Sequence, residues 1–368
     1  MKINKTRIAV IAAVVVLFSI LVSVIFLYGR GGTEDDAQVK VGLVLTGTKH
    51  DGGWNEAHYK ALAVLEEEMD FRLICRENIP ETDDSIIAVI DEMAAEGASI
   101  ICASGWGYGD SIFEVNEQYP DIVFLHCSGT EKSENVAGFF GRMYQARYLT
   151  GIAAGMRTQS HSIGYVASMP TVEVIRGINA FTLGVRSVDP EATVHVLWTN
   201  AWDNITLEKQ LTDQLIDDYG ADVVSYHQNT AAVCEEADAR GVYSVGYHYD
   251  NTASFPDTCL TAAVWNWTDF YRSRIRECIG GDFTGNTYWD GYSEGAVAIS
   301  RLSDCCAEGT AQAVEAAQER LIDGDWDVFF GPIYDNSGAL RVEEGTSLSD
   351  DYLLNDLTWF VEGVDSAE

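Results

Sequence analysis

Apolar and polar positions divide the chain into short apolar runs that alternate with helix-like segments. The first apolar run, 39–45, precedes a segment at 56–69 whose apolar residues recur every three or four positions. Uninterrupted apolar runs of this length are typical of strands that are buried on both faces of a parallel sheet. The same pattern predicts strands at 71–75, 98–103, 121–127 and 136–140, with one helix at 83–96 and another that ends at Tyr119.

The alternation then begins again, after a small-residue helix predicted at 143–156. It predicts strands at 162–167, 193–198, 222–226 and 242–247, separated by helices at 172–188, 207–219 and 230–240. A third segment starts with a strand at 260–263 and a helix at 265–279, and 327–340 is expected to form two short strands around an Asp-Asn-Ser-Gly turn. Strands that alternate with helices in this way predict an α/β protein with two parallel-sheet units in series.

The N-terminal segment differs from the rest, because 8–28 is an uncharged, mainly apolar run long enough to span a bilayer. Lys2, Lys5 and Arg7 precede this run, so the positive-inside rule leaves the N-terminus in the cytoplasm and exports the remainder. The run does not end in a small-residue cleavage site. We therefore expect 1–30 to be an uncleaved membrane anchor, 31–38 a polar linker, and the folded part to be extracytoplasmic.

Composition narrows the possible partners. The net charge is −34, from 23 Lys and Arg against 57 Asp and Glu. Nucleic acids and anionic lipid surfaces require clustered basic residues, so neither is expected as a partner. The eight cysteines could form disulfides in an exported protein, but their spacing does not define the pairs. The chain contains none of the C-x-x-C, H-E-x-x-H or EF-hand patterns, so no metal or cofactor is expected.

Aromatic and polar residues gather where the predicted strands end. In open α/β sheets ligands bind beyond the carboxyl ends of the strands. Tryptophan faces stack on planar rings, and Asn, Asp and His supply donors and acceptors for ring edges. These residues predict a site for a flat heteroaromatic ligand; they are Asp51, Trp54, Asn55, Trp106, Asn200, Trp202, His248, Asp250, Trp265 and Asn266. For the first three the alternative is structural: Asp51 or Asn55 could cap the following helix, and Trp54 could belong to the core.

The sequence also contains a match to a catalytic motif. Gly291-Tyr-Ser293-Glu-Gly295 matches the G-x-S-x-G pattern of a nucleophile elbow. That motif requires an apolar strand directly before it, whereas the preceding residues, 284–290, are mostly polar or aromatic. We therefore expect no enzymatic activity, and a hydrolase acting through Ser293 is the alternative.

Seven segments, in order along 39–363, resemble the basic membrane protein family. They are GGWNEAHYKAL, YPDIVFLHCSG, NVAGFFGRMYQARYLTGIAAG, IGYVASMPTVEVIRGINAFTLGVRSVDP, GADVVSYHQNT, ARGVYSVGYHYD and FFGPIYDNSGALRV. The family consists of extracytoplasmic ligand-binding partners of ABC importers, and its characterised members bind purine nucleosides and related compounds. The resemblance implies no catalysis and makes an ABC permease the expected partner.

The resemblance also implies a type I periplasmic-binding fold, with two Rossmann-like lobes joined by a hinge and the ligand held between them. Lobe 1 would comprise 39–140 with parts of 260–368, and lobe 2 would comprise 141–259 with the hinge crossings and other parts of the C-terminal segment. Trp54 and Asn55 match the aromatic-Asn pair that stacks on and bonds the base in the family. Trp202 resembles the opposite aromatic wall.

Two departures bear on the ligand. Nucleoside-binding members carry a G-V-D-S-D type segment whose first Asp holds ribose hydroxyls, and here His248 takes that place in GYHYD. Where they carry a Lys after the next strand, this chain has Trp265. The segment VIRGINAFTLG, with W-x-N-x-W and V-W-N-W, is similar to a branch associated with free purine bases such as adenine. We therefore expect the ligand to be a purine nucleobase, with a purine nucleoside as the alternative ligand. A membrane-anchored ligand sensor is the alternative function.

Overall fold

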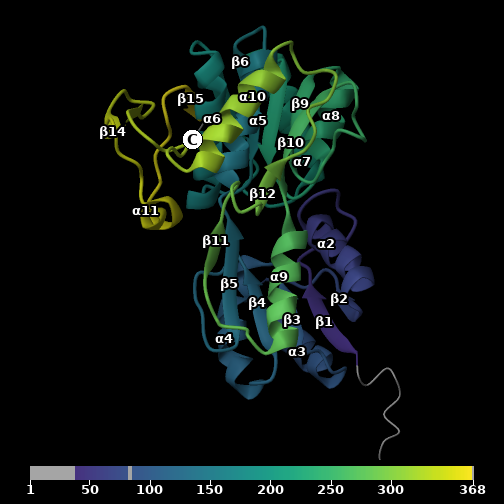
Figure 1. Cartoon of the computed structure of the whole chain (residues 1–368). Coiled ribbons are helices and arrows are strands. Elements are labelled where there is room, and N and C mark those ends of the chain that lie inside the picture. The colour runs from purple at the N-terminus through teal and green to yellow at the C-terminus, as the bar shows by residue number, and fades with distance from the viewer. Residues whose placement is uncertain (1–37, 82–84, 367–368) are drawn as a thin grey trace, which may run out of the picture.

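The computed structural model describes residues 38–81 and 85–366, which form two α/β lobes stacked one above the other in Figure 1. Lobe 1, the lower one in that view, is built on a six-stranded sheet with the strand order β11-β5-β4-β3-β1-β2. All its strand pairs are parallel. The strands are β1 (Val39–Val44), β2 (Phe71–Arg76), β3 (Ile100–Ala103), β4 (Val123–Cys127), β5 (Val136–Gly141) and β11 (Tyr288–Asp290).

Helices cover both faces of the lobe 1 sheet. They are α2 (Trp54–Met69), α3 (Ser85–Ala95), α4 (Gly109–Val115) and α9 (Trp267–Gly280). Alternate residues of each strand serve opposite faces: Leu43 and Leu125 belong to the core under α2 and α9, while Val44 and Phe124 pack with α3 and α4. The apolar runs read from the sequence are therefore strands buried on both faces, as expected.

Lobe 2 is built on a seven-stranded sheet with the order β12-β10-β9-β8-β6-β7-β15. Its strands are β6 (Ser162–Ala167), β7 (Thr193–Trp198), β8 (Val223–His227), β9 (Tyr243–His248), β10 (Cys259–Trp265), β12 (Val297–Ile299) and β15 (Val364–Ser366). All pairs are parallel except β10 with β12. A separate antiparallel pair, β13 (Ile333–Tyr334) and β14 (Leu340–Val342), confirms the turn expected near the C-terminus.

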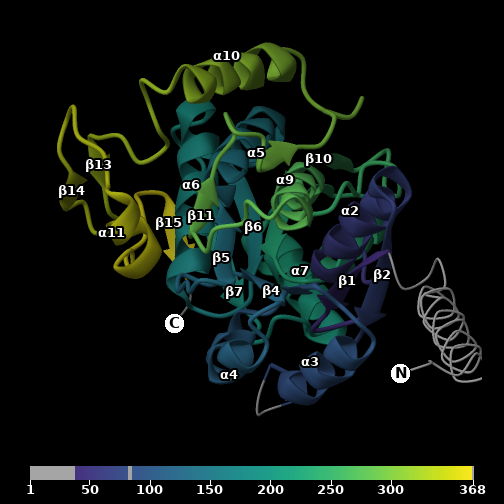
Figure 2. The ribbon, with the colours of Figure 1, turned by 60° about the horizontal axis from the view of Figure 1, so that its bottom comes forward.

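The helices of lobe 2 are α5 (Met143–Arg157), α6 (Val172–Val188), α7 (Ile205–Tyr219), α8 (Ala232–Arg240), α10 (Thr310–Asp323) and α11 (Asp350–Asn355). The first two and α10 lie on one face of the sheet, opposite α7 (Figure 2). Helices α5 and α6 pack closely because Gly184 has no side chain. A Cβ at that position would lie only 2.0 Å from the Tyr148 carbonyl oxygen. Helix α5 is consequently buried throughout Met143 to Gly155, which places its polar residues inside the lobe.

The chain passes between the lobes at three places. It crosses from β5 into α5, from β10 into α9, and from β11 into β12. The second crossing corrects a predicted boundary, because the helix expected at 265–279 begins only at Trp267. Trp265 instead ends β10 and pairs with Val297 of β12. Similarly, the helix expected to end at Tyr119 stops at Val115 and continues as a single tighter turn, Asn116–Gln118.

Two further expectations from the sequence concern a membrane span and the pairing of the cysteines. The predicted membrane span at 8–28 lies outside the described residues. Within 38–81 and 85–366, no helix is long and apolar enough to cross a membrane. All eight cysteines lie inside these ranges, and each is a free thiol in the structure.

Candidate functional site

The loop between β1 and α2 is held together by the Asp51 carboxylate. Its two oxygens accept hydrogen bonds from the backbone N–H groups of Gly53, Asn55 and Glu56, at 2.9 to 3.0 Å. It also accepts one from the Asn55 side-chain amide at 2.8 Å. Burial raises the pKa of Asp51, although these hydrogen bonds act in the opposite direction. Asp51 therefore caps the first turn of α2, which was the structural alternative drawn from the sequence.

The Asn55 side chain is likewise committed to this loop. It is 2% exposed, and its oxygen accepts a hydrogen bond of 3.2 Å from the Thr46 hydroxyl. Its amide nitrogen donates to Asp51, as described above. Both residues fix the start of α2 and thereby the position of Trp54, and direct contact of either with a ligand stays a prediction.

Trp54 lies at the centre of an interlobe aromatic cluster. Five rings surround it, with centroids 4.5 to 6.5 Å away: His58, Phe140, His248, Trp265 and Trp267. Its indole Nε1 donates a hydrogen bond of 3.1 Å to the Ser104 carbonyl oxygen. His248 and Trp265 end strands of lobe 2, whereas the other members belong to lobe 1. The two lobes are therefore in contact here, and Trp54 is part of that contact.

The hydrogen bond between Trp265 and His248 defines the protonation state of His248. Trp265 Nε1 can only donate, so His248 Nδ1, 2.9 Å away, must accept. A neutral His248 then carries its proton on Nε2, which is buried and has no partner in the structure. Burial and the nearby positive groups hold the pKa of His248 well below its usual value, so the neutral form persists at neutral pH.

Four neighbouring strand ends each present a buried polar atom without a hydrogen-bond partner. Ser104 follows β3 in lobe 1, while Ser168 follows β6, Gln228 follows β8 and His248 ends β9 in lobe 2. The unpartnered atoms are Ser104 Oγ, Ser168 Oγ, Gln228 Oε1 and His248 Nε2, and none of the four residues is more than 4% exposed. We call these residues the strand-end polar set. Buried polar groups are nearly always hydrogen-bonded, so unpartnered atoms at the carboxyl ends of strands in both sheets indicate a place for a ligand.

Sequence reasoning identified only His248 of this set. The serines and Gln228 do follow buried apolar strands directly, so their positions carried a usable signal. The predicted site contains only Trp, Asn, Asp and His residues, so it does not include them. The missing information was which strand ends face the other lobe, and that depends on the strand order of both sheets.

The other predicted site residues lie at varying distances from this centre. Trp202 is half-buried, and its ring lies 6.4 Å from that of His227, which is itself 6.4 Å from His248. Trp106 is 74% exposed, and Asn200 is also exposed. The Asp250 carboxylate accepts hydrogen bonds from the backbone and hydroxyl of Thr252. The Asn266 amide donates to Asp269 at 3.0 Å. The structure thus brings Trp54, His248 and Trp265 together, and Asp250 lines a cavity with the last two. Direct contact of the other residues with a ligand stays a prediction.

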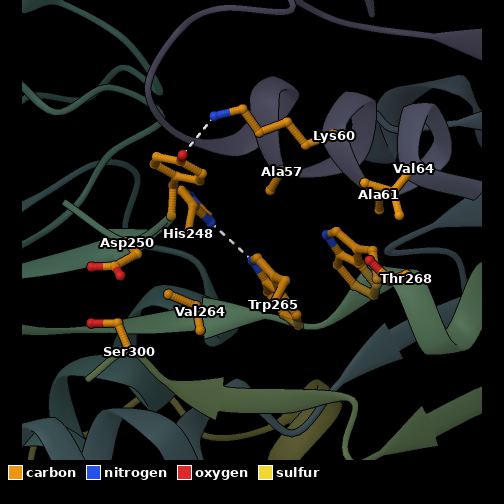
Figure 3. Close-up of a pocket in the computed structure, with 12 residues that line it drawn as sticks. Ala57, Lys60, Ala61, Val64, His248, Asp250, Val264, Trp265, Thr268 and Ser300 are labelled. Carbon is orange, nitrogen blue, oxygen red and sulfur yellow. Dashed lines mark hydrogen bonds between the residues drawn. The ribbon is translucent and has the colours of Figure 1, made fainter. Parts of the chain in front are cut away.

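A cavity of about 390 Å³ lies between α2 and α9 of lobe 1 and strands β9 and β10 of lobe 2 (Figure 3). Trp265 and Trp267 form one wall, with their rings stacked 4.5 Å apart. On the opposite side, Lys60 bridges the lobes by donating a hydrogen bond of 2.5 Å to the Tyr249 hydroxyl. The cavity adjoins the strand-end polar set through His248 and has room for a small heterocycle.

Ser293 does not have the environment of a nucleophile elbow. Its hydroxyl donates a hydrogen bond of 2.6 Å to the Glu294 carboxylate next to it. The preceding strand β11 has only three residues, and the chain continues into strand β12 instead of a helix. The motif match therefore lacks the strand-turn-helix context that the chemistry requires.

His58→Phe is expected to change stability in a pH-dependent way. His58 is fully buried, stacks on Trp267 at 4.9 Å and shares a hydrogen bond of 2.7 Å with the Tyr271 hydroxyl. Burial lowers the pKa of His58 to about 3, from 6.5 for an exposed histidine. Only the unfolded chain takes up this proton as the pH falls below 6.5, so wild-type stability declines there, by at most about 1.4 kcal/mol per pH unit. Phenylalanine keeps the ring but cannot titrate.

At pH 7.5 the variant should be less stable by about 1 kcal/mol, because the Tyr271 hydroxyl loses its partner. Urea unfolding at pH 7.5, 6 and 5 should show this deficit shrinking and then reversing. A deficit that is the same at all three pH values would mean that His58 is protonated equally in both states.

Comparison with known proteins gives consistent matches. The family model named Bmp, described as ABC transporter substrate-binding protein PnrA-like, matches residues 38–324. A putative ABC transporter glucose-binding protein of Haloferax volcanii is 31% identical over 336 residues, covering 91% of this chain and 82% of that protein. A purine-binding protein of Brucella abortus is 30% identical over 337 residues, covering 91% of this chain and 95% of that protein.

Solved structures show the same architecture. An ABC transporter solute-binding protein of Conexibacter woesei superposes with a TM-score of 0.68 at 20% identity, over 78% of this chain and 98% of that one. One from Aeropyrum pernix gives 0.68 at 18% identity, over 81% and 93%. At these identities the likeness concerns the fold alone, and it confirms the two Rossmann-like lobes expected from the sequence.

Proposed function

Because the chain belongs to the Bmp family of ABC transporter substrate-binding proteins, we propose that it captures a purine nucleobase between its lobes and hands it to a permease. The observation that carries the proposal is the strand-end polar set, whose members come from both lobes and each present one buried side-chain atom without a hydrogen-bond partner. A ligand that bonds to all of them would hold the lobes together. In this role the protein binds its ligand without chemically changing it.

The free atoms suit the edge of a nitrogen heterocycle. His248 Nε2 is a donor, for the reason given above. Gln228 Oε1 is an acceptor, since the amide nitrogen of the same side chain donates to the Thr199 hydroxyl at 2.8 Å. The hydroxyls of Ser104 and Ser168 can act in either way. Purine edges likewise present both donors and acceptors, and adenine is the base that the resemblance seen in the sequence suggests.

The rings provide walls for a flat ligand. Trp54, His248, His227 and Trp202 form a chain of rings that runs from lobe 1 into lobe 2, with neighbouring centroids 5.2 to 6.4 Å apart. Trp54 stands at the lobe 1 end of this chain and Trp202 at its lobe 2 end, and we propose them as the two faces that the base contacts. Stacking of a base on an aromatic side chain contributes about 1–3 kcal/mol, so two such faces and a few hydrogen bonds would give micromolar affinity.

A nucleobase is favoured over a nucleoside because the two positions that resemble ribose-binding ones are filled by a mutually bonded pair. His248 Nδ1 and Trp265 Nε1 are used in their mutual hydrogen bond, and neither side chain offers the carboxylate or ammonium group that the resembling positions supply to ribose. The similarity to a glucose-binding protein makes glucose a necessary comparison ligand. The N-terminal run at 8–28 would tether the protein on the outer side of the membrane, near its permease. A ligand sensor would use the same site but would need a signalling partner.

The proposal can be tested without assuming a ligand. Protein purified from its source under native conditions is washed, denatured, and its released small molecules are identified by mass spectrometry. We expect a purine base in near-stoichiometric amount. A nucleoside would establish the alternative ligand, and a sugar would overturn the proposal of a purine.

A further inference from the structure

Arg147 is the most unusual charged residue in the described part of the chain. It belongs to α5, is completely buried, and none of its three guanidinium nitrogens has a hydrogen-bond partner. The guanidinium stacks on the Tyr247 ring, with its carbon 3.4 Å from the ring centroid. Stacking stabilises the cation but leaves its in-plane N–H groups without acceptors. A buried, unpartnered charge is expensive to maintain, so this one calls for a functional explanation.

The guanidinium faces a small cavity of about 10 Å³ in lobe 2. The first two turns of α5 and α6 and the ends of β8 and β9 line it, with residues that include Met143, Arg147, Glu173, Arg176, His227 and Tyr247. All four elements present these ends toward lobe 1, at the edge where ligands bind in open α/β sheets. The volume corresponds to about one oxygen atom or one water molecule.

The cavity, which we call the Arg147 pocket, adjoins the proposed ligand site directly. The Tyr247 ring that supports Arg147 also stacks on the His248 ring, with centroids 3.6 Å apart. His227 lines the pocket, and its ring lies between Trp202 and His248 in the chain of rings. A ligand held between Trp54 and Trp202 could therefore extend one substituent into the pocket.

The charge inside the pocket is positive. Arg147 and Arg176 face a single carboxylate, Glu173, whose oxygen lies 3.4 Å from His227 Nε2. Arg176 has another partner, because it donates a hydrogen bond of 2.5 Å to the Leu353 carbonyl oxygen. Burial lowers the pKa of His227 to about 4, so this histidine is neutral at neutral pH. The positive ends of two helices add to the excess, in a protein whose net charge is −34.

We propose that the Arg147 pocket binds an exocyclic oxygen of the ligand, and that the preferred ligand is consequently an anionic oxopurine of the xanthine type. This inference rests on the proposed function, since it concerns the chemical class of purine that the same site selects. A guanidinium recognises an oxyanion through charge-assisted hydrogen bonds, whereas the amino group of adenine would bring donor to donor. The pocket thus shifts the expected base from adenine toward purines that carry oxygen and negative charge.

The test compares three purines by isothermal titration calorimetry: xanthine, hypoxanthine and adenine. Hypoxanthine has one exocyclic oxygen fewer than xanthine and is less acidic, so it isolates the contribution of the second oxygen and its charge. Wild-type protein should bind xanthine most tightly. Arg147→Met should weaken xanthine binding by at least tenfold while changing adenine binding by less than threefold, and Arg147→Lys should fall between wild type and Arg147→Met.

Arg157→Met is the matched control. Arg157 also belongs to α5 and stacks on a tyrosine of β9, with its guanidinium carbon 3.7 Å from the Tyr243 ring centroid. It lies at the opposite end of both elements, so its loss should leave all three affinities unchanged. Circular dichroism melts accompany each variant, and Arg147→Lys, which retains the charge, replaces Arg147→Met if the latter does not fold.

The outcomes separate the two levels of the argument. Equal losses for xanthine and adenine in Arg147→Met, or no loss for xanthine, would overturn the Arg147 pocket and leave purine binding intact. Adenine titrations are repeated with inorganic phosphate present. If phosphate strengthens adenine binding in wild type but not in Arg147→Met, the pocket binds a free anion, and its proposed role in binding an oxygen of the ligand is overturned. Wild-type protein that binds no purine would overturn the proposed function, and the pocket's assignment would fall with it.

Discussion

Trp54→Ala is expected to destabilise the protein by about 3–5 kcal/mol and to weaken ligand binding by at least tenfold. The indole is 8% exposed and touches five other rings, so its removal opens a cavity in the contact between the lobes. It also leaves the Ser104 carbonyl oxygen without its indole donor, beside a hydroxyl that belongs to the strand-end polar set. Urea unfolding measures the first effect and calorimetric titration the second.

Two companion variants separate packing from recognition. Trp54→Phe retains most of the apolar volume but cannot bond to the Ser104 carbonyl oxygen, so it should recover more stability than affinity. Trp106→Ala is the matched tryptophan control, because Trp106 is 74% exposed and its loss should change stability by less than about 0.5 kcal/mol. If Trp54→Ala destabilised the protein but bound the ligand as tightly as wild type, Trp54 would be a core residue only.

Gly53→Ala is expected to weaken ligand binding by at least tenfold while leaving each lobe folded. Gly53 directly precedes α2 in lobe 1, and a Cβ there would lie 1.9 Å from the Asn229 carbonyl oxygen of lobe 2. The neighbouring Trp54 N–H donates to that same oxygen at 3.3 Å. Since the obstacle is backbone and not a flexible side chain, the lobes must separate to admit the methyl group. Any ligand gripped by both lobes then loses contacts.

Small-angle X-ray scattering with the ligand in excess measures the result. Wild-type protein should become more compact when the ligand is added, and Gly53→Ala should stay extended. Gly280→Ala serves as control, because the added Cβ would meet only the end of the Asp282 side chain, at 3.3 Å. Full compaction and unchanged affinity in Gly53→Ala would show that this contact is not needed for binding.

Much of the fold could be predicted from the pattern of apolar residues. Strands buried on both faces leave a continuous apolar signal, and the long helices α2, α6 and α7 leave a periodic one. The pattern does not predict helices α10 and α11 or the short strands β11, β12 and β15. Three-residue strands carry too little pattern to recognise, and β15 reaches its place beside β7 only through the tertiary fold. Trp265 was assigned to a helix because its pairing with Val297 is not visible in sequence.

The pattern of aromatic residues at strand ends predicts a ligand site, and the structure brings three of these residues, Trp54, His248 and Trp265, together at the boundary between the lobes. That a ligand binds there stays a prediction. Asp51 and Asn55 have side chains that could bind a ligand. In the structure, however, these side chains form hydrogen bonds within their own loop. Arg147 lay unnoticed in a segment read as a small-residue helix. Its significance comes from complete burial without a partner, which depends on every element that surrounds α5.

The central claim is that the two lobes close on a purine base. Isothermal titration calorimetry of the wild-type protein with a panel of ligands tests it most directly, using xanthine, adenine, adenosine and glucose under identical conditions. The account predicts one-to-one binding of a free base with micromolar or tighter affinity, adenosine at least tenfold weaker, and no heat of binding with glucose. Tighter binding of adenosine than of either base, or binding of glucose alone, would contradict it.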